Sequence, residues 1–361
     1  MNLIDLMNWL GRSKPLRPAG QMMLYLATKI SFPLLLRIAG RRIVSAFAGA
    51  PAIISTHSSI RDTLRDPRLL FKAMTFTVEK MGLDTLCLFA DMSLEAEACG
   101  CQVHFDDFQV PSVMTHPVNT IDDIVGLKVP DPHHDGRMPV FLETMRLMKR
   151  NFTMLKIGEV SGPFTLATNL AGTEMYLDTR KNPQKARAVL EYCEKVIIQY
   201  ARALIEAGAD MILIAEPTGS QLSASAYEDY SLGYTKRIIS SLARSCILHI
   251  CGKTGHIIEK MCQSGAVGLS VDEVDISKLI KIVPDSIVII GNISPLKFAK
   301  SSPEEIENET SHLLETVKTR KEFLVAPGCD LAPQTPLENI LSFIKTARKR
   351  HSKSIQTCNR V

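Results

Sequence analysis

The stretch Ile247-Leu248-His249-Ile250-Cys251-Gly252-Lys253 is an apolar run that ends in a histidine and a cysteine at alternate positions and then breaks into glycine. Such a run, bounded by glycine, is typical of a buried β-strand. Because the side chains of a strand alternate between its two faces, His249 and Cys251 are expected on one face, where the strand becomes a loop. The stretch therefore predicts two metal-binding side chains that point into the same space.

A second short apolar run, Phe323-Leu324-Val325-Ala326-Pro327-Gly328-Cys329-Asp330, is organised in the same way and carries Cys329 just past its end. One His and two Cys would hold a tetrahedral zinc ion with one exchangeable position, as expected of a catalytic site. Zinc lowers the pKa of a bound thiol as it does that of water, so the site could also hold a substrate thiol as its thiolate. A lone His at a strand end is more often structural, so the prediction depends on all three residues meeting.

Short non-alternating strands separated by amphipathic helices predict a parallel α/β sheet. Eight strands are expected, near residues 25, 86, 157, 213, 248, 269, 289 and 325. Eight such strands indicate a (β/α)₈ TIM barrel. We expect an N-terminal helical extension over residues 1–60, the catalytic barrel over 61–350 and a polar tail over 351–361. The barrel is expected to begin in one helix over 61–80 and to end in a helix from 336 to about 350, with helices over 138–151 and 276–282 and a strand over 211–215 between them.

Active sites of this fold lie at the carboxyl ends of the strands, which makes several polar residues candidates. The carboxylates expected there as catalytic groups are Asp91, Glu159, Glu216 and Asp272, and the candidates for binding the cofactor are Asn292 and Ser161. A carboxylate in a barrel mouth usually handles a proton or binds a partner group. Asp272 could equally cap the next helix, and Asn292 could make only an Asx turn.

The composition excludes several classes of protein. With 42 Lys and Arg against 38 Asp and Glu, the formal charge of +4 is too small to indicate nucleic-acid binding. The nine cysteines form no compact framework and no secretory signal is recognised, which favours a reducing cytoplasmic location. Basic residues interrupt the apolar region 22–54, so stable membrane insertion is not expected, although a surface helix that touches lipid stays open.

Several motifs resemble those of a known family. They are Leu248-His249-Ile250-Cys251-Gly252-Lys253, Gly268-Leu269-Ser270-Val271-Asp272-Glu273, Gly291-Asn292-Ile293-Ser294 and Ala326-Pro327-Gly328-Cys329. Together they are similar to motifs of the uroporphyrinogen decarboxylase superfamily, and within it to the methylcobamide:coenzyme M methyltransferases of methanogens. The resemblance covers roughly residues 60–350.

The resemblance implies that His249, Cys251 and Cys329 bind zinc. It also implies a carboxylate ligand at the position of Asp272, where this sequence has Asp in place of the expected Glu. The implied reaction moves a methyl group from a methylcobamide, carried by a partner corrinoid protein, to a small thiol, with coenzyme M as the expected acceptor.

Three other functions remain open from the sequence. A uroporphyrinogen-decarboxylase-type tetrapyrrole decarboxylase needs no metal and would leave the three zinc-type ligands unexplained. A corrinoid:tetrahydrofolate methyltransferase has no use for a zinc thiolate. A zinc-stabilised scaffold that only binds a corrinoid protein would unfold when zinc is removed.

Overall fold

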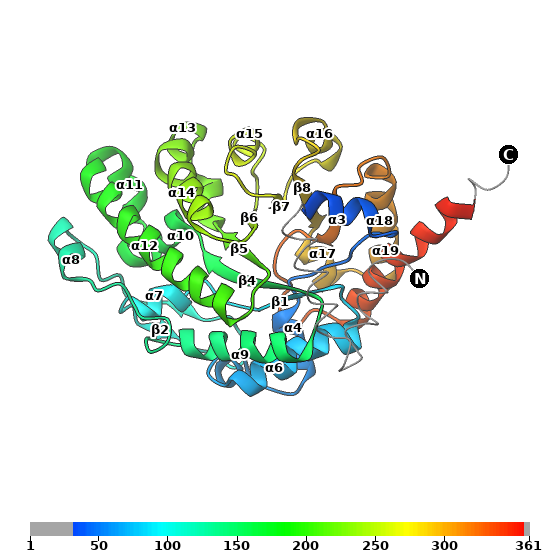
Figure 1. Cartoon of the computed structure of the whole chain (residues 1–361), viewed down its shortest axis with the longest axis horizontal. Helices are drawn as coiled ribbons and strands as arrows, with labels where there is room; N and C mark the ends of the chain where they lie inside the picture. Colours follow the sequence, from blue (N-terminus) through cyan, green and yellow to red (C-terminus); the bar gives the residue numbers. More distant parts are fainter. Residues whose placement is uncertain (1–31, 357–361) are drawn as a thin grey trace.

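A computed structural model of the protein describes residues 32–356. Its main sheet has seven parallel strands, which follow one another around the molecule in the order β1-β4-β5-β6-β7-β8-β9 (Figure 1). Their bounds are β1 Thr85–Cys87, β4 Leu155–Ser161, β5 Met211–Ala215, β6 Cys246–Ile250, β7 Gly268–Val271, β8 Val288–Ile293 and β9 Phe323–Pro327. The predicted α/β barrel class is confirmed, and these seven strands lie at seven of the eight predicted places.

The eighth strand, predicted near residue 25, lies outside the described residues. The segment from Ile43 to Ser45 occupies the position between the two edge strands. Val44 forms a parallel bridge with Val325 of β9, and the amide of Asp84, just before β1, donates to the Val44 carbonyl at 3.0 Å. This short segment therefore links β9 to β1, because both edges of the sheet offer it unpaired backbone groups.

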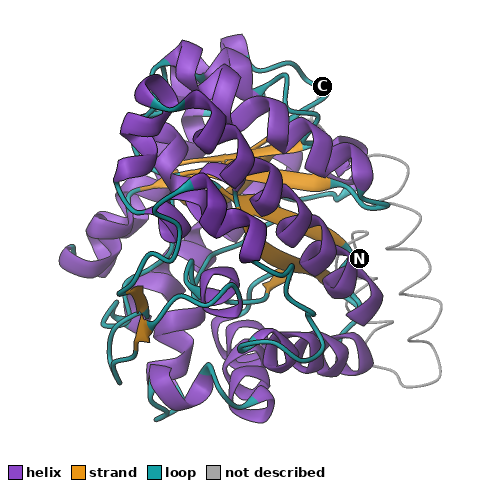
Figure 2. Ribbon diagram, turned by 90° about the vertical axis from the view of Figure 1, so that its left-hand side faces the viewer, coloured by secondary structure: helices purple, strands orange, loops and turns teal. Residues whose placement is uncertain are grey.

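Helices cover the outer face of the sheet and fill the connections between its strands (Figures 1 and 2). The longer ones are α6 Pro67–Phe76, α9 Met138–Asn151, α10 Pro163–Ala171, α11 Glu174–Lys181, α12 Pro183–Ala207, α14 Gly233–Ser241, α18 Pro303–Thr316 and α19 Leu337–Gln356. The shorter ones are α3 Phe32–Ile38, α4 Gly49–Ser55, α5 Ile60–Thr63, α7 Leu94–Ala98, α8 Ile121–Gly126, α13 Ala224–Tyr227, α15 Ile258–Met261, α16 Ile276–Ile282 and α17 Pro295–Lys300. Single turns of π- or 3₁₀-helix occupy η1 Thr77–Met81, η2 Pro217–Gln221 and η3 Glu228–Leu232. None of these helices is both long and apolar enough to span a membrane.

The single helix predicted over residues 61–80 is wrong. The chain instead forms α5, breaks, and restarts as α6 at Pro67. The side chain of Asp66 accepts hydrogen bonds from the amides of Arg68 and Leu69, which caps the new helix. Proline at the first helical position favours this restart, because it lacks the amide hydrogen that a continuing helix would need.

A small antiparallel ribbon of β2 Val103–His104 and β3 Ser112–Val113 stands apart from the main sheet in Figure 2. It belongs to the long connection between β1 and α9. At the other end of the chain, α19 continues past its predicted end at Arg350 to Gln356, because no Gly or Pro interrupts that stretch.

Side chains of the strands divide into an inner and an outer set. The inner set includes Ile157, Leu213 and Ile247, which pack with α3 residues such as Phe32 and Leu35. The outer set, including Leu248, packs against the surrounding helices. Because residues two apart share a face, His249 continues the inner row of Ile247. Helix α3 thus fills the end of the barrel opposite the strands' carboxyl ends.

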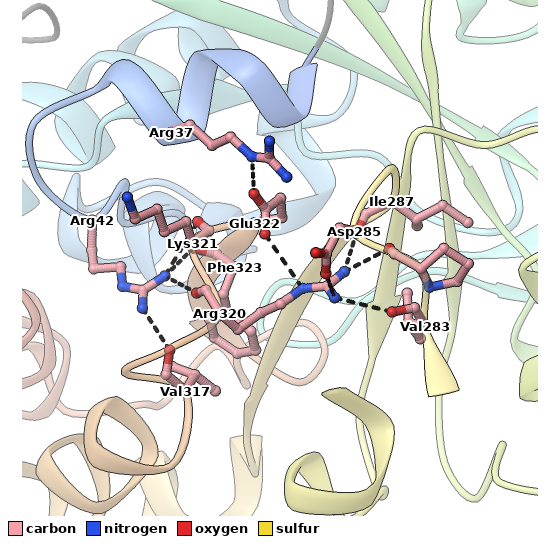
Figure 3. A network of polar contacts seen from close by, with 11 residues as sticks. Arg37, Arg42, Val283, Asp285, Ile287, Val317, Arg320, Lys321, Glu322 and Phe323 are labelled. Atoms are coloured by element: carbon pink, nitrogen blue, oxygen red, sulfur yellow. Dashed lines mark hydrogen bonds and ion pairs between the residues drawn. The ribbon is translucent and has the colours of Figure 1, made fainter. Parts of the chain in front are cut away.

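A network of arginines fixes α3 and the segment after it to this end (Figure 3). Arg37 of α3 forms an ion pair with the buried Glu322, which precedes β9. Arg42 donates to the carbonyls of Val317 and Arg320, each at 2.6 Å. Arg320, buried in turn, pairs with Asp285 and donates to the carbonyl of Ile287 at 2.9 Å. The arginine side chains thus satisfy backbone carbonyls that would otherwise be buried without a partner at this end of the barrel.

Candidate metal centre

Three side chains from the carboxyl ends of two strands, β6 and β9, meet at one end of the barrel. The Nε2 atom of His249 lies 3.0 Å from Sγ of Cys251 and 3.5 Å from Sγ of Cys329. The two sulfur atoms are 3.0 Å apart. Two thiols and an imidazole nitrogen that converge on one point can hold a metal ion, with zinc matching this set of donors.

The ring of His249 is fixed from behind. Its Nδ1 atom lies 2.9 Å from the hydroxyl of Ser270, which belongs to the neighbouring strand β7. The ring of Phe47 lies beside it, with 5.5 Å between the ring centroids. A hydrogen bond at Nδ1 favours the tautomer that leaves Nε2 with a lone pair directed at the two sulfurs.

The surroundings of Cys329 disfavour its ionised form. The hydrogen bond with Cys251 and burial both raise the pKa of the Cys329 thiol well above its usual range. A cation bound between the two sulfur atoms would favour the ionised form of both thiols. The donor set and its electrostatics fit a divalent metal ion.

Asp272 and Asn292 lie next to this cluster. Asp272 follows β7, and its carboxylate accepts a hydrogen bond from the amide of Gly252 at 3.1 Å. The side-chain amide of Asn292 donates to the carbonyls of Asp272 and Val274, at 2.8 and 2.9 Å. Asn292 therefore holds the loop after β7 and has its amide hydrogens committed to it.

Asp91 and Ser161 belong to a second group on the other side of the mouth. Asp91 is buried and forms a two-pronged ion pair with Arg137, at 2.7 and 3.1 Å. Arg137 also pairs with Glu97. Both the amide and the hydroxyl of Ser161 lie within hydrogen-bond distance of the carboxyl group of Glu95, at 2.7 and 2.9 Å. Ser161 thus holds the carboxyl group of Glu95 in place.

Glu159 differs from the other predicted carboxylates. It lies on the inward face of β4 two residues after Ile157 and is only 5% exposed, and its carboxyl group has no hydrogen bond or ion pair among the residues that the structure describes. Burial, followed by the charges of Asp330 and Glu95, raises the pKa of Glu159 well above its usual range. A buried carboxyl without a partner is costly, which marks it as a candidate for a functional role.

Glu216 has a different environment. Its carboxylate accepts hydrogen bonds from the amides of Phe164 and Thr165, at 2.8 and 2.6 Å, and from the hydroxyl of Ser231 at 3.1 Å. The two amides belong to the first turn of α10, so the carboxylate caps that helix. Burial raises the pKa of Glu216, while these donors act against the rise. These contacts indicate that Glu216 holds the first turn of α10 in place.

The sequence prediction missed several residues of the site. Ser270 shares the face of Asp272 two positions away, so the period of the strand could have identified it. Asp330 directly follows Cys329, so its place after the carboxyl end of a strand could have identified it as well. Glu95 and Arg137 come from the connection after β1, and no periodicity places their side chains at the mouth.

A comparison with known protein families shows to which family the chain belongs. The model of the uroporphyrinogen decarboxylase family matches residues 33–350. The chain belongs to the uroporphyrinogen decarboxylase family. This confirms the superfamily to which the motifs were similar.

Relatives within this family carry two kinds of name. A methylcobamide:CoM methyltransferase of Methanosarcina acetivorans is 30% identical over 278 residues, which are 74% of this chain and 80% of the relative. A uroporphyrinogen decarboxylase of Geobacter sulfurreducens is 25% identical over 331 residues, or 88% of this chain and 94% of the relative. A solved structure of a methyltransferase from Methanosarcina mazei has a TM-score of 0.79 at 27% identity, covering 85% of this chain and 93% of its own. The similarity to methyltransferases thus extends over most of this chain.

Proposed function

We propose that this protein transfers a methyl group from a methyl-Co(III) cobamide, carried by a partner corrinoid protein, to the thiol of coenzyme M. We further propose that His249, Cys251 and Cys329 bind the zinc ion that this reaction uses. The observation that carries the proposal is the convergence of these three donors, with 3.0 Å between the two sulfurs. The names of the relatives supply the donor and the acceptor.

A zinc ion at these residues would keep the substrate thiol deprotonated at neutral pH while leaving its sulfur nucleophilic. The chain's own residues prepare for this. Ser270 orients His249, and Cys251 and Cys329 lie at the mouth, where a docked corrinoid protein can reach. The three donors thereby fix the position from which the sulfur approaches the methyl group.

The proton of the thiol needs an acceptor, and we assign this role to Glu159. In its ionised form, Glu159 takes the proton as the thiol binds. The thiolate sulfur then donates an electron pair to the methyl carbon and forms the S–C bond. The Co–C bond breaks, and its electron pair remains on cobalt as Co(I). The proton on Glu159 afterwards returns to solvent.

The charges at the mouth favour methyl transfer over tetrapyrrole decarboxylation. The acidic side chains of a tetrapyrrole need cations, whereas this mouth carries the carboxyl groups of Asp91, Glu95 and Glu159. Among residues 32–356, the cation that contacts this group is Arg137, which is already paired with Asp91 and Glu97. A corrinoid:tetrahydrofolate methyltransferase would in turn leave the His/Cys/Cys cluster without a use.

The proposal predicts that the purified, zinc-loaded protein demethylates free methylcobalamin under anaerobic conditions when coenzyme M is present. Absorbance should record the loss of methyl-Co(III) and the formation of Co(I), and both should depend on the thiol and on zinc. Methyl transfer to tetrahydrofolate without zinc, or release of CO₂ from uroporphyrinogen, would replace the proposal by one of its rivals. A zinc-free sample that unfolds completely would favour the scaffold.

Glu159→Gln tests the proton acceptor. We expect the rate of methylcobalamin demethylation at pH 7 to fall about 100-fold, since the amide cannot take the proton. Because burial raises the pKa of Glu159, the wild-type rate should rise with pH, and the variant should lose this rise. Glu206→Gln, which alters an exposed residue of α12, is the matched control. A variant that keeps the wild-type rate and pH profile would remove Glu159 from the reaction.

A further inference from the structure

The loop after β7 contacts both loops that carry the cysteines. Oδ2 of Asp272 accepts the amide hydrogen of Gly252, the residue that follows Cys251, at 3.1 Å. On its other side, Asp272 packs against Gly328, the residue that precedes Cys329. A Cβ atom on Gly328 would lie 2.4 Å from Oδ1 of Asp272 and 2.9 Å from its Cα, so only glycine allows this approach.

The same loop is held rigidly in place. The Asp272 carbonyl accepts from Asn292 of β8 at 2.8 Å, and the Val274 amide also bonds to it, at 2.9 Å. Ser270, two residues before Asp272, contacts Nδ1 of His249. The end of β7 therefore touches the segments of all three candidate ligands.

The carboxylate of Asp272 is not part of the converging donor set. The donor atoms of His249, Cys251 and Cys329 all lie within 4.8 Å of one another, and across residues 32–356 no carboxylate oxygen shares that arrangement with them. The side chain of Asp is one methylene shorter than that of Glu, and here it is bonded to the Gly252 amide. The position of the Asp272 side chain suits a residue that links the loop of Cys251 to the loop of Cys329.

We infer that Asp272 is a positioning residue that sets the distance between Cys251 and Cys329, and that the metal centre has three protein ligands. This rests on the proposed function, and it departs from the carboxylate ligand that the family resemblance implied. It follows that the acceptor thiol displaces no protein side chain when it binds. Removing a group that holds metal ligands in place without touching the metal commonly weakens metal affinity 10- to 100-fold.

Asp272→Asn separates the two roles, because the amide oxygen can still accept from Gly252 but replaces a carboxylate ligand poorly. We expect Asp272→Asn to bind zinc within about threefold of the wild-type affinity, measured by competition with a chelator. The visible absorption spectrum of the cobalt(II)-loaded variant should match that of the wild type, because the spectrum reports the number and kind of ligands. Asp272→Ala loses the link and should bind zinc about 10- to 100-fold more weakly.

Gly328→Ala provides a second test that removes no polar group. The added methyl pushes Asp272 away, so this variant should lose metal affinity as Asp272→Ala does. Unchanged affinity in Gly328→Ala would overturn the inference, as would a changed cobalt spectrum or an Ala-like loss of affinity in Asp272→Asn. A wild-type protein that binds no metal would instead refute the proposed function, and this inference with it.

Discussion

Replacing Cys329 with alanine is expected to abolish thiol methylation and to lower the zinc content of the purified protein. The variant keeps only His249 and Cys251 of the three converging donors. Two ligands bind zinc far more weakly than three, so the affinity should fall at least about 100-fold. Zinc content measured by mass spectrometry, together with the rate of methylcobalamin demethylation, checks both effects in one preparation.

A matched control separates loss of the metal from loss of a cysteine. Cys262, at the end of α15, is a half-buried thiol, and the donor cluster does not include it. Cys262→Ala should therefore keep full zinc content and activity. If Cys329→Ala also kept both, His249, Cys251 and Cys329 would have to be abandoned as a metal site.

The parts of the fold that the sequence predicted well are those with strong local signals. The predicted limits of helix Met138–Asn151, strand Met211–Ala215 and helix Ile276–Ile282 agree with the structure residue for residue. Each has a clear period and a polar, Gly or Pro boundary, so local preference and tertiary packing agree there. The meeting of His249, Cys251 and Cys329 followed from one further rule, the position of active sites at strand ends.

The environment of each carboxyl group could not be predicted in the same way. Glu159 and Glu216 both follow apolar runs, yet the carboxyl group of Glu159 has no partner in the described part of the chain, whereas that of Glu216 accepts hydrogen bonds from the first turn of α10. The difference depends on which helix end packs beside each strand end. Such contacts join residues about 50 positions apart, and periodicity carries no information about them.

Glu95 gives the second large effect, on stability. It is almost fully buried, and its carboxyl group lies within hydrogen-bond distance of the amide and the hydroxyl of Ser161, which are neutral groups. Burial raises its pKa from 4.5 to about 7, against the opposing effect of those hydrogen bonds. In the folded protein the carboxyl group therefore holds its proton to a higher pH than it does in the unfolded chain.

The sign of the pH dependence follows from this difference. Between pH 4.5 and about 7, unfolding releases the proton of Glu95, so a rise in pH favours the unfolded state. The free energy of unfolding should fall by about 3 kcal/mol across this window because of this group alone. Below pH 4.5 both states are protonated, and the penalty is absent.

Glu95→Gln should remove this part of the pH dependence, because the amide cannot ionise and can still bond to Ser161. Urea unfolding from pH 5 to 8 should show the variant gaining stability relative to the wild type as pH rises, with the largest difference above pH 7. Glu304→Gln, on the exposed side of α18, controls for the loss of one negative charge. A difference between Glu95→Gln and wild type that stays constant with pH would mean that Glu95 ionises in the folded protein as readily as in the unfolded chain. The charge of Glu95 would then be present at neutral pH, where it raises the pKa of Glu159 and makes that carboxylate a stronger base.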